Sequence, residues 1–394
     1  MTQVIALAAA EHRRSAGEAF FGGQAERISR LCHLMAERFA RGGRLVAFGC
    51  TPTARSDVRH IAVEFVHPVI VGKRALPAIG LAREGGELVR QVELIVRAAD
   101  IAIGFGVDED GGEAARALQL ARHRGCLTIA FAPGGAEWEI EPAVADRYVR
   151  QELVETLYHV LWELVHVFFE HRGLLEGRSE RRTHDSGASS FLYPFLAERE
   201  HDLEAVLDDV RTSVLMKAHE VGALRAQTLS ENADTLFEAA TSVRERLERG
   251  GVLLALGNGG SATDAMDLVA DFRSDADGRH AWPAIDLTED PAILTAIAND
   301  IGTEAIFLRQ VIAYGHEADV LVALSTSGNS LNVIEALGEA RRRGLETIAM
   351  VGYDGGRVLS ERLADHVVVT RSQHIPRIQE AQASAYHVLR QLVS

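Results

Sequence analysis

The chain has 394 residues, of which 47% are hydrophobic and 25% charged, a composition typical of a folded protein with two or three domains. Its net charge of −15 argues against direct nucleic-acid binding, which needs clustered Lys and Arg to neutralise phosphates. No apolar run approaches the ~18 residues that suggest a membrane span. The first 20 residues lack a basic stretch before their short apolar patch, so we predict no signal peptide and expect a cytoplasmic protein without a membrane partner.

The first half of the chain starts with a helical pattern over roughly 10–41. A short apolar run ending at Gly49 follows, then a loop and a helical segment, and later a second apolar run, ADIAIGF. Runs of four to six apolar residues bounded by glycines suit buried parallel strands. Residues 173–193 are polar, rich in Arg, Ser and Gly, and without a clear period, which indicates a linker after a first domain over 1–172.

The pattern of the first half returns in the second half. The matching segments keep one order along the chain, and the longest pair aligns over 32 positions without a gap. The pairs are Arg41-Gly42-Gly43 with Arg249-Gly250-Gly251, ALPAIGL at 75–81 with AWPAIDL at 281–287, and 99–130 with 318–349. Several matches in one order are very unlikely by chance, so we infer a tandem duplication.

The second half, 194–394, is predicted to form the second domain. Its first part, roughly 194–248, has the pattern of a long helical hairpin. Five apolar runs follow, namely VLLAL, PAIDL, VLVAL, TIAMVG and HVVV. Helical patterns separate most of them, and this alternation predicts α/β architecture, with a doubly wound, flavodoxin-like, five-stranded parallel sheet in each half.

Two polar loops of the second half carry the strongest chemical signal. One is Gly257-Asn258-Gly259-Gly260-Ser261, and the other is Ser325-Thr326-Ser327-Gly328-Asn329-Ser330. Each follows a predicted strand and precedes a predicted helix. Glycines allow close backbone approach, and hydroxyls together with free N–H groups at a helix N-terminus bind anions. Strand-to-helix turns with ordinary caps look similar, but two such loops at the carboxyl ends of strands in one sheet favour a phosphate site.

These loops belong to a longer set of motifs that resembles bacterial phosphoheptose isomerase, a member of the SIS-domain family of sugar-phosphate isomerases. GNGGSATDAMDLVADF, AIANDIG, STSGNS and RIQEAQASAYHVL match in order and spacing over roughly 200–394, and the first half resembles the family more weakly. The resemblance implies that the phosphate is held by Ser261, Ser325, Thr326, Ser327 and Ser330. It implies sugar contacts from Asn258 and Asp300, and Gly259, Gly260 and Gln379 complete the predicted substrate-binding set.

The family isomerises its substrate with a Glu and a His. The second half has His387, but Asp267 stands where the family has His, and Asp271 stands where it has Glu. An aspartate is one methylene shorter than a glutamate, and misplacement by about an ångström can cost a large rate factor. The resemblance therefore predicts Asp271 and His387 as the acid–base pair, with a binding pocket lacking turnover as the alternative.

Some members of the family bind zinc through a His and a Glu four residues apart and a Gln and a His eight apart. The first half keeps these residue types as His60, Glu64, Gln151 and His159, so zinc is the predicted cofactor, with no nucleotide or organic cofactor. Glu64 and His159 also match the catalytic pair. Eight helical residues rise about 12 Å, so Gln151 shares an ion with His159 only if Gln151 precedes the helix or acts from another subunit.

The phosphate loops of the first half are degenerate. Residues 49–56 read GCTPTARS, and residues 106–111 read GVDEDG, where three carboxylates would repel a phosphate. Two histories remain open. Either the first half lends metal or catalytic groups to the second half, or the second half works alone and the first is a scaffold.

The leading function is conversion of sedoheptulose 7-phosphate to D-glycero-D-manno-heptose 7-phosphate through an enediolate. The alternatives are a non-catalytic adaptor, like the replication-initiator-associating relatives of the family, and a sugar-phosphate sensor. The family is usually tetrameric, so the duplicated chain is expected to form a homodimer that is a pseudo-tetramer of domains.

Overall fold

The computed structural model describes residues 2–69, 73–82, 86–109, 111–170, 175 and 202–393. These residues form two compact units. The N-terminal unit comprises 16–220, and the C-terminal unit comprises 1–15 together with 221–394. Apart from Leu175, the predicted linker at 173–193 lies outside the described residues. Among the described helices, none has the length and apolarity to cross a membrane.

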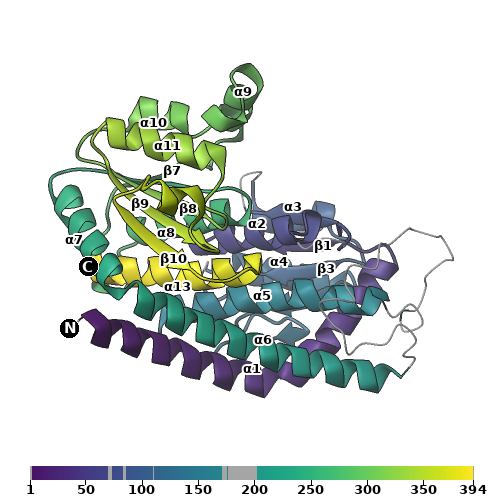
Figure 1. Ribbon diagram of the computed structural model, residues 1–394. Coiled ribbons are helices and arrows are strands. Elements are labelled where there is room, and N and C mark those ends of the chain that lie inside the picture. The colour runs from purple at the N-terminus through teal and green to yellow at the C-terminus, as the bar shows by residue number, and fades with distance from the viewer. Residues whose placement is uncertain are drawn as a thin grey trace. The chain divides into compact units, whose positions relative to one another are not determined.

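The N-terminal unit contains a five-stranded sheet in the order β2-β1-β3-β4-β5, with every neighbouring pair parallel (Figure 1). Helix α1 starts at Thr2, earlier than the predicted start near residue 10, and both α1 and α6 contribute residues to the two units. The elements are α1 (Thr2–Ala40), β1 (Leu45–Phe48), α2 (Pro52–Val66), β2 (Ala78–Leu81), α3 (Leu88–Ile95), β3 (Ile101–Gly104), α4 (Glu113–His123), β4 (Leu127–Ala130), β5 (Trp138–Glu139), α5 (Arg147–Glu170) and α6 (Leu203–Glu231).

The C-terminal unit repeats this topology, and its sheet has the order β10-β9-β8-β6-β7, again parallel throughout. The five apolar runs predicted from the sequence form these five strands. The elements are α7 (Ala233–Glu248), β6 (Leu253–Leu256), α8 (Gly260–Arg273), η3 (Ala276–Gly278), β7 (Ala284–Asp286), α9 (Pro291–Asp300), η4 (Thr303–Ala305), α10 (Leu308–Tyr314), β8 (Val320–Ser325), α11 (Leu331–Arg342), β9 (Glu346–Gly352), α12 (Gly356–Ser360), β10 (His366–Thr370) and α13 (Ile375–Val393).

Each face of the C-terminal sheet packs against a different set of helices. Alternate strand residues point to opposite faces, so Leu253 and Val320 join a core with α7, α8 and α13. Their neighbours Leu254 and Leu321 join a second core with α10, α11 and α12. Because both faces are buried, the strands are almost entirely apolar, as expected for a parallel sheet. The doubly wound prediction is confirmed.

The repeated Arg-Gly-Gly segment has the same structural role in both units. Gly42 and Gly250 adopt φ angles of 85° and 88°, in the left-handed region that favours glycine. A Cβ atom on Gly43 would lie 2.1 Å from the Ala99 carbonyl oxygen, and one on Gly251 would lie 2.1 Å from that of Ala318. Gly43 and Gly251 stand just before the first strand of each unit, and Ala99 and Ala318 stand just before its central strand, β3 or β8. Glycine is therefore needed because the two segments pass so close to each other.

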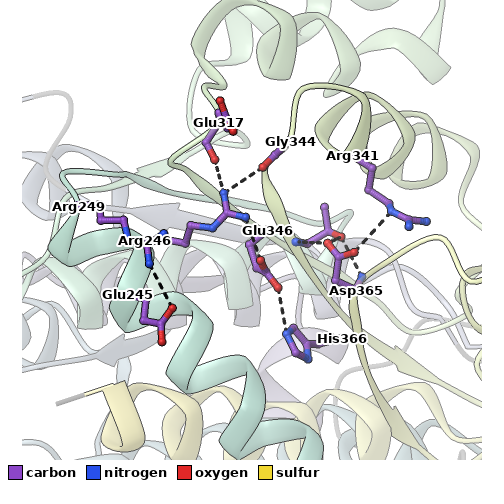
Figure 2. A network of polar contacts seen from close by, with 10 residues as sticks. Glu245, Arg246, Arg249, Glu317, Arg341, Gly344, Glu346, Asp365 and His366 are labelled. Carbon is purple, nitrogen blue, oxygen red and sulfur yellow. Dashed lines mark hydrogen bonds and ion pairs between the residues drawn. The ribbon is translucent and has the colours of Figure 1, made fainter.

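An arginine five residues before each of these close-approach glycines clamps two loops at the amino edge of its sheet. Arg38 donates to the carbonyl oxygens of Ala98 at 2.7 Å and Gly125 at 2.9 Å. Figure 2 shows the corresponding contacts of Arg246, which donates to the carbonyl oxygens of Glu317 and Gly344. The equivalent contacts support duplication independently of the sequence match.

In the C-terminal unit, Arg246 also begins a chain of ion pairs along the amino edge of the sheet. Arg246 Nη2 lies 3.1 Å from Glu346 Oε2, and Glu346 Oε1 lies 3.1 Å from His366 Nε2 (Figure 2). These residues come from the end of α7 and the beginnings of β9 and β10. These contacts therefore tie the beginnings of β9 and β10 to the end of α7.

A buried aspartate before the central strand braces each sheet. Asp100 accepts from the backbone N–H of Arg44 and Arg97, both at 2.9 Å, and Asp319 accepts from those of Val252 and His316, both at 2.8 Å. Burial favours the neutral acid of Asp100, but hydrogen bonds from the Arg44 side chain and from the backbone of Arg44 and Arg97 outweigh it and lower the pKa of Asp100. Asp100 is therefore charged at neutral pH.

Replacement of Gly251 by alanine is expected to destabilise the protein by at least about 2 kcal/mol, because the Cβ atom overlaps the Ala318 carbonyl. Gly43→Ala should have a similar effect through Ala99. Gly23→Ala is the control, since a Cβ at this position in α1 meets nothing within 4 Å. Urea unfolding gives the free energies, and equal stabilities of Gly251→Ala and Gly23→Ala would contradict the close-approach explanation.

Candidate functional site

The two predicted polar loops of the C-terminal unit lie at the switch point of its sheet. They follow β6 and β8, which are hydrogen-bonded neighbours. The helix after β6 packs on one face of the sheet and the helix after β8 packs on the other. Ligands of open α/β sheets bind where the connections diverge in this way. We call residues 257–261 and 325–330 the switch-point loops.

Two asparagine side chains connect the switch-point loops. Asn258 Nδ2 donates to Asn332 Oδ1 at 3.0 Å, and Asn332 Nδ2 donates to Asn258 Oδ1 at 2.8 Å. Asn258 and Gly259 are exposed, Gly260 is half-buried and begins α8, and Ser261 is buried. The structure thus brings the predicted binding residues of the first loop to the start of α11.

Residues 325–330, which we call the serine-rich loop, are braced by two of their own hydroxyls. Ser325 Oγ accepts from the backbone N–H of Gly328, and Ser327 Oγ accepts from that of Asn329, both at 3.2 Å. Thr326, Ser327 and Ser330 are half-buried. Because an anion binds through hydroxyl and N–H donors, this loop presents the groups that a phosphate requires beside the N-terminus of α11.

Asp300 lies on α9, an element other than those that carry the switch-point loops. It is the exposed last residue of α9, and its carboxylate accepts a hydrogen bond from Asn299 at 2.7 Å. Figure 1 shows α9 beyond α10 and α11, on the opposite side of the unit from α13. Its predicted contact with a sugar hydroxyl remains a prediction.

Below α8, three buried titratable side chains converge. Asp267 and Asp271 are four residues apart on α8 and therefore share one face of the helix. The Oδ2 atoms of both lie 3.4 Å from His387 Nε2 on α13. Tyr386 donates its hydroxyl to Asp267 Oδ2 at 2.9 Å. The predicted pair of Asp271 and His387 is thus within reach of proton exchange, and Gln379 is buried on the same helix.

The N-terminal unit contains a corresponding cluster between α2 and α5. His60 Nε2 lies 3.3 Å from His159 Nε2, and Tyr158 Oη lies 2.9 Å from His60 Nδ1. Ligand atoms of His60, Glu155 and His159 all lie within 4.8 Å of one another. Glu64 Oε1 is 4.0 Å from His60 Nε2. Of the four predicted metal-site residues, His60 and His159 belong to this group and Glu64 lies beside His60, whereas Gln151 is half-buried two turns earlier on α5.

Burial, and then the neighbouring His159, hold the pKa of His60 well below its ordinary value. His60 is therefore neutral at pH 7, and a neutral imidazole has a lone pair for a cation. Two nitrogens bound to one tetrahedral zinc at about 2.0–2.1 Å lie roughly 3.3 Å apart. The separation of the two ring nitrogens fits a shared zinc ion, with Glu155 as a carboxylate donor.

Sequence reasoning missed Glu155 and the two tyrosines. Glu155 stands four residues before His159 on α5, a spacing that places both on one helix face and was visible in the sequence. Tyr158 and Tyr386 each precede the site histidine of their unit and bond to matching positions of the partner helix. The repeat itself was the signal that could have identified them.

At the corresponding switch point of the N-terminal unit, acidic side chains form contacts with other residues of the same unit. Glu113, at the start of α4, accepts from the Leu88 backbone N–H at 2.8 Å and lies 3.7 Å from Cys50 Sγ. Asp108 forms a 2.7 Å ion pair with Arg150. Carboxylates in these positions disfavour a phosphate, in keeping with the degenerate loops of the sequence.

The fold and the switch-point loops define a sugar-phosphate isomerase of the SIS class. The SIS domain model matches residues 218–352. Phosphoheptose isomerase from Nitratidesulfovibrio vulgaris (strain DSM 19637 / Miyazaki F) is 41% identical over 186 residues, covering 47% of this chain and 88% of the relative. The phosphoheptose isomerase from Pelodictyon phaeoclathratiforme (strain DSM 5477 / BU-1) is 40% identical, and the alignment covers 50% of this chain and 91% of the relative. The chain belongs to the phosphoheptose isomerase family, and these relatives span about half of it.

Similarity in fold extends over nearly the whole chain. The C-terminal domain of glucosamine-fructose-6-phosphate aminotransferase from Francisella tularensis aligns with a TM-score of 0.58 at 10% sequence identity. The alignment covers 98% of this chain and 93% of that one. Both units are therefore SIS folds, including the half that the matched isomerases do not cover.

Proposed function

We propose that the C-terminal unit isomerises sedoheptulose 7-phosphate to D-glycero-D-manno-heptose 7-phosphate. The observation that carries the proposal is the pairing of a phosphate-type loop at the switch point with buried carboxylates that reach His387. The substrate comes from the phosphoheptose isomerases that the chain resembles at about 40% identity. The serine-rich loop would hold the phosphate and leave the open-chain sugar to the buried acid–base group.

The reaction moves a proton between neighbouring carbons. A base removes a proton from C1 of the ketose, and the electron pair passes to the C2 carbonyl oxygen to give an enediolate. Transfer of the O1 proton to O2 and return of a proton to C2 then give the aldose. Asp271 is proposed as the base and His387 as the group that exchanges the proton with it over 3.4 Å. Burial of both groups excludes bulk water from the transfer.

Deuterium exchange tests this proposal directly. The protein is incubated with sedoheptulose 7-phosphate in deuterated water, and the sugar is followed by NMR. Aldose product or deuterium at the reacting carbons is the expected result. Binding without exchange in any metal condition would contradict an isomerase and leave a sugar-phosphate sensor.

Zinc is proposed for the N-terminal unit, with His60, His159 and Glu155 as donors and Glu64 and Gln151 as the further residues that the family implies. A zinc ion held there supplies a Lewis acid and cross-links α2 to α5. The neutral His60 and the 3.3 Å separation of the imidazole nitrogens support this assignment. Tyr158 orients the His60 ring through Nδ1.

The double variant His60→Ala/His159→Ala is expected to lose zinc from the purified protein, because both nitrogen donors are removed. Elemental analysis of wild type and variant measures the metal content, and added zinc should raise the melting temperature of the wild type only. His123→Ala/His316→Ala is the matched control, since both histidines are exposed. Equal zinc content in wild type and site variant would contradict this metal site.

Assembly and location are also proposed. The duplicated chain is expected to form a homodimer, a pseudo-tetramer of SIS domains, in the cytoplasm, with no direct nucleic-acid partner. The net charge of −15 supports the last point. Light scattering of the purified protein measures the mass, and a monomer at micromolar concentration would contradict the dimer.

A further inference from the structure

We propose that Asn332 is a specificity-determining residue, which holds Asn258 in place and with it presents an amide surface to the sugar hydroxyls of the bound phosphate ester. The proposal rests on the function proposed above and extends it to a residue outside the predicted site. Asn332 is the second residue of α11, directly after the serine-rich loop. It therefore lies beside the proposed phosphate position while its side chain reaches the other switch-point loop.

The two amides form a closed pair. Each Nδ2 donates to the Oδ1 atom of the other, at 3.0 and 2.8 Å. Asn332 Oδ1 also accepts from the Val333 backbone N–H at 3.0 Å, which anchors the pair to the first turn of α11. Asn258 lies two residues beyond the buried strand β6 and is itself exposed. Its orientation is thus imposed by Asn332, across the two strands at the switch point.

Counting donors and acceptors shows what the pair can still bind. An amide has two N–H donors and two acceptor lone pairs. After these contacts, each Nδ2 retains one N–H, and Asn258 Oδ1 retains one lone pair, whereas Asn332 Oδ1 has both engaged. The pair therefore offers two donors and one acceptor in a fixed arrangement.

This mixed surface suits a polyol better than a phosphate. A phosphate dianion is bound by donors alone, and an acceptor pointing at it is unfavourable. A sugar hydroxyl both donates and accepts, so two donors and one acceptor match neighbouring hydroxyls. Sites built to hydrogen-bond a hydroxyl discriminate strongly against ligands without it. Asn332 thereby adds selectivity for the sugar, while the serine-rich loop supplies affinity for the phosphate.

The test compares two ligands on a double-mutant cycle. Calorimetry measures the dissociation constants of sedoheptulose 7-phosphate and inorganic phosphate for wild type, Asn258→Ala, Asn332→Ala and the double variant. We expect Asn332→Ala to raise the dissociation constant of the sugar phosphate about ten-fold, since one to two hydrogen bonds are lost. The dissociation constant of inorganic phosphate should change by less than about two-fold. The double variant should bind the sugar phosphate no more weakly than Asn332→Ala does, because the two amides act as one unit.

Two further variants keep the test decisive. Asn332→Leu has a similar volume and replaces Asn332→Ala if the smaller side chain destabilises α11. Glu335→Ala, at an exposed position of the same helix, is the control and should change neither constant. Unchanged sugar-phosphate binding by Asn332→Ala, or additive losses in the cycle, would overturn the proposal. A wild type that binds phosphate but no sugar phosphate would instead overturn the proposed function.

Discussion

Replacement of Asp271 by asparagine is expected to lower the rate of deuterium exchange into the sugar about 10²–10⁴-fold, the usual contribution of a positioned general base. Asparagine has nearly the same shape but cannot accept the substrate proton. Asp271 is buried, and its Oδ2 lies 3.4 Å from His387 Nε2, so few other groups can replace it. NMR in deuterated water measures the exchange, and the effect should fall on kcat.

The control for this prediction is Asp275→Asn. The change is identical, but Asp275 is exposed and follows the end of α8. It should retain the wild-type rate, and both variants should bind inorganic phosphate normally, since neither residue belongs to the switch-point loops. If Asp271→Asn exchanges deuterium at the wild-type rate, Asp271 is not the base, and Asp267→Asn becomes the variant to examine.

The parallel strands were predictable because apolar runs and glycines are local signals. VLLAL, VLVAL and TIAMVG are buried on both faces, and such continuous runs indicate parallel strands without any knowledge of their neighbours. The repeat indicated that the two halves share one topology, and both sheets indeed have the same strand order. The start of α1 was placed too late because its first turns bury the small residues Ala6 and Ala10 and expose the larger Val4, Ile5 and Leu7, so the large apolar residues do not mark the buried face.

The side-chain clusters were only partly predictable. Asp267 and Asp271 could be placed on one helix face from their spacing, but their distance from His387 depends on how α8 and α13 pack. Glu155 joins His60 for the same reason, since α2 and α5 are distant in sequence. The Asn258–Asn332 pair depends on two loops that meet only when the sheet has formed. Sequence spacing fixes contacts within an element, and packing fixes those between elements.

The double variant Ser325→Ala/Ser327→Ala is expected to weaken binding of inorganic phosphate at least about 100-fold. Hydrogen bonds to a charged group contribute about 1.5–3 kcal/mol each, and the variant removes two donors. In the free protein the same hydroxyls accept from the N–H groups of Gly328 and Asn329. Their removal therefore also loosens the loop that would carry those N–H groups to the anion. Calorimetry with inorganic phosphate measures the loss.

Loss of binding through unfolding must be separated from loss of the two donors. Ser360→Ala is the matched control, since Ser360 is exposed at the end of α12, and thermal unfolding of each variant shows whether the C-terminal unit remains folded. A folded double variant with wild-type affinity would mean that the phosphate does not bind at the serine-rich loop. A folded variant with the expected loss, and with Asp271 and His387 intact, would place phosphate binding and proton transfer on separate elements, β8–α11 and α8–α13. Phosphate affinity could then be lost without any change in the acid–base group.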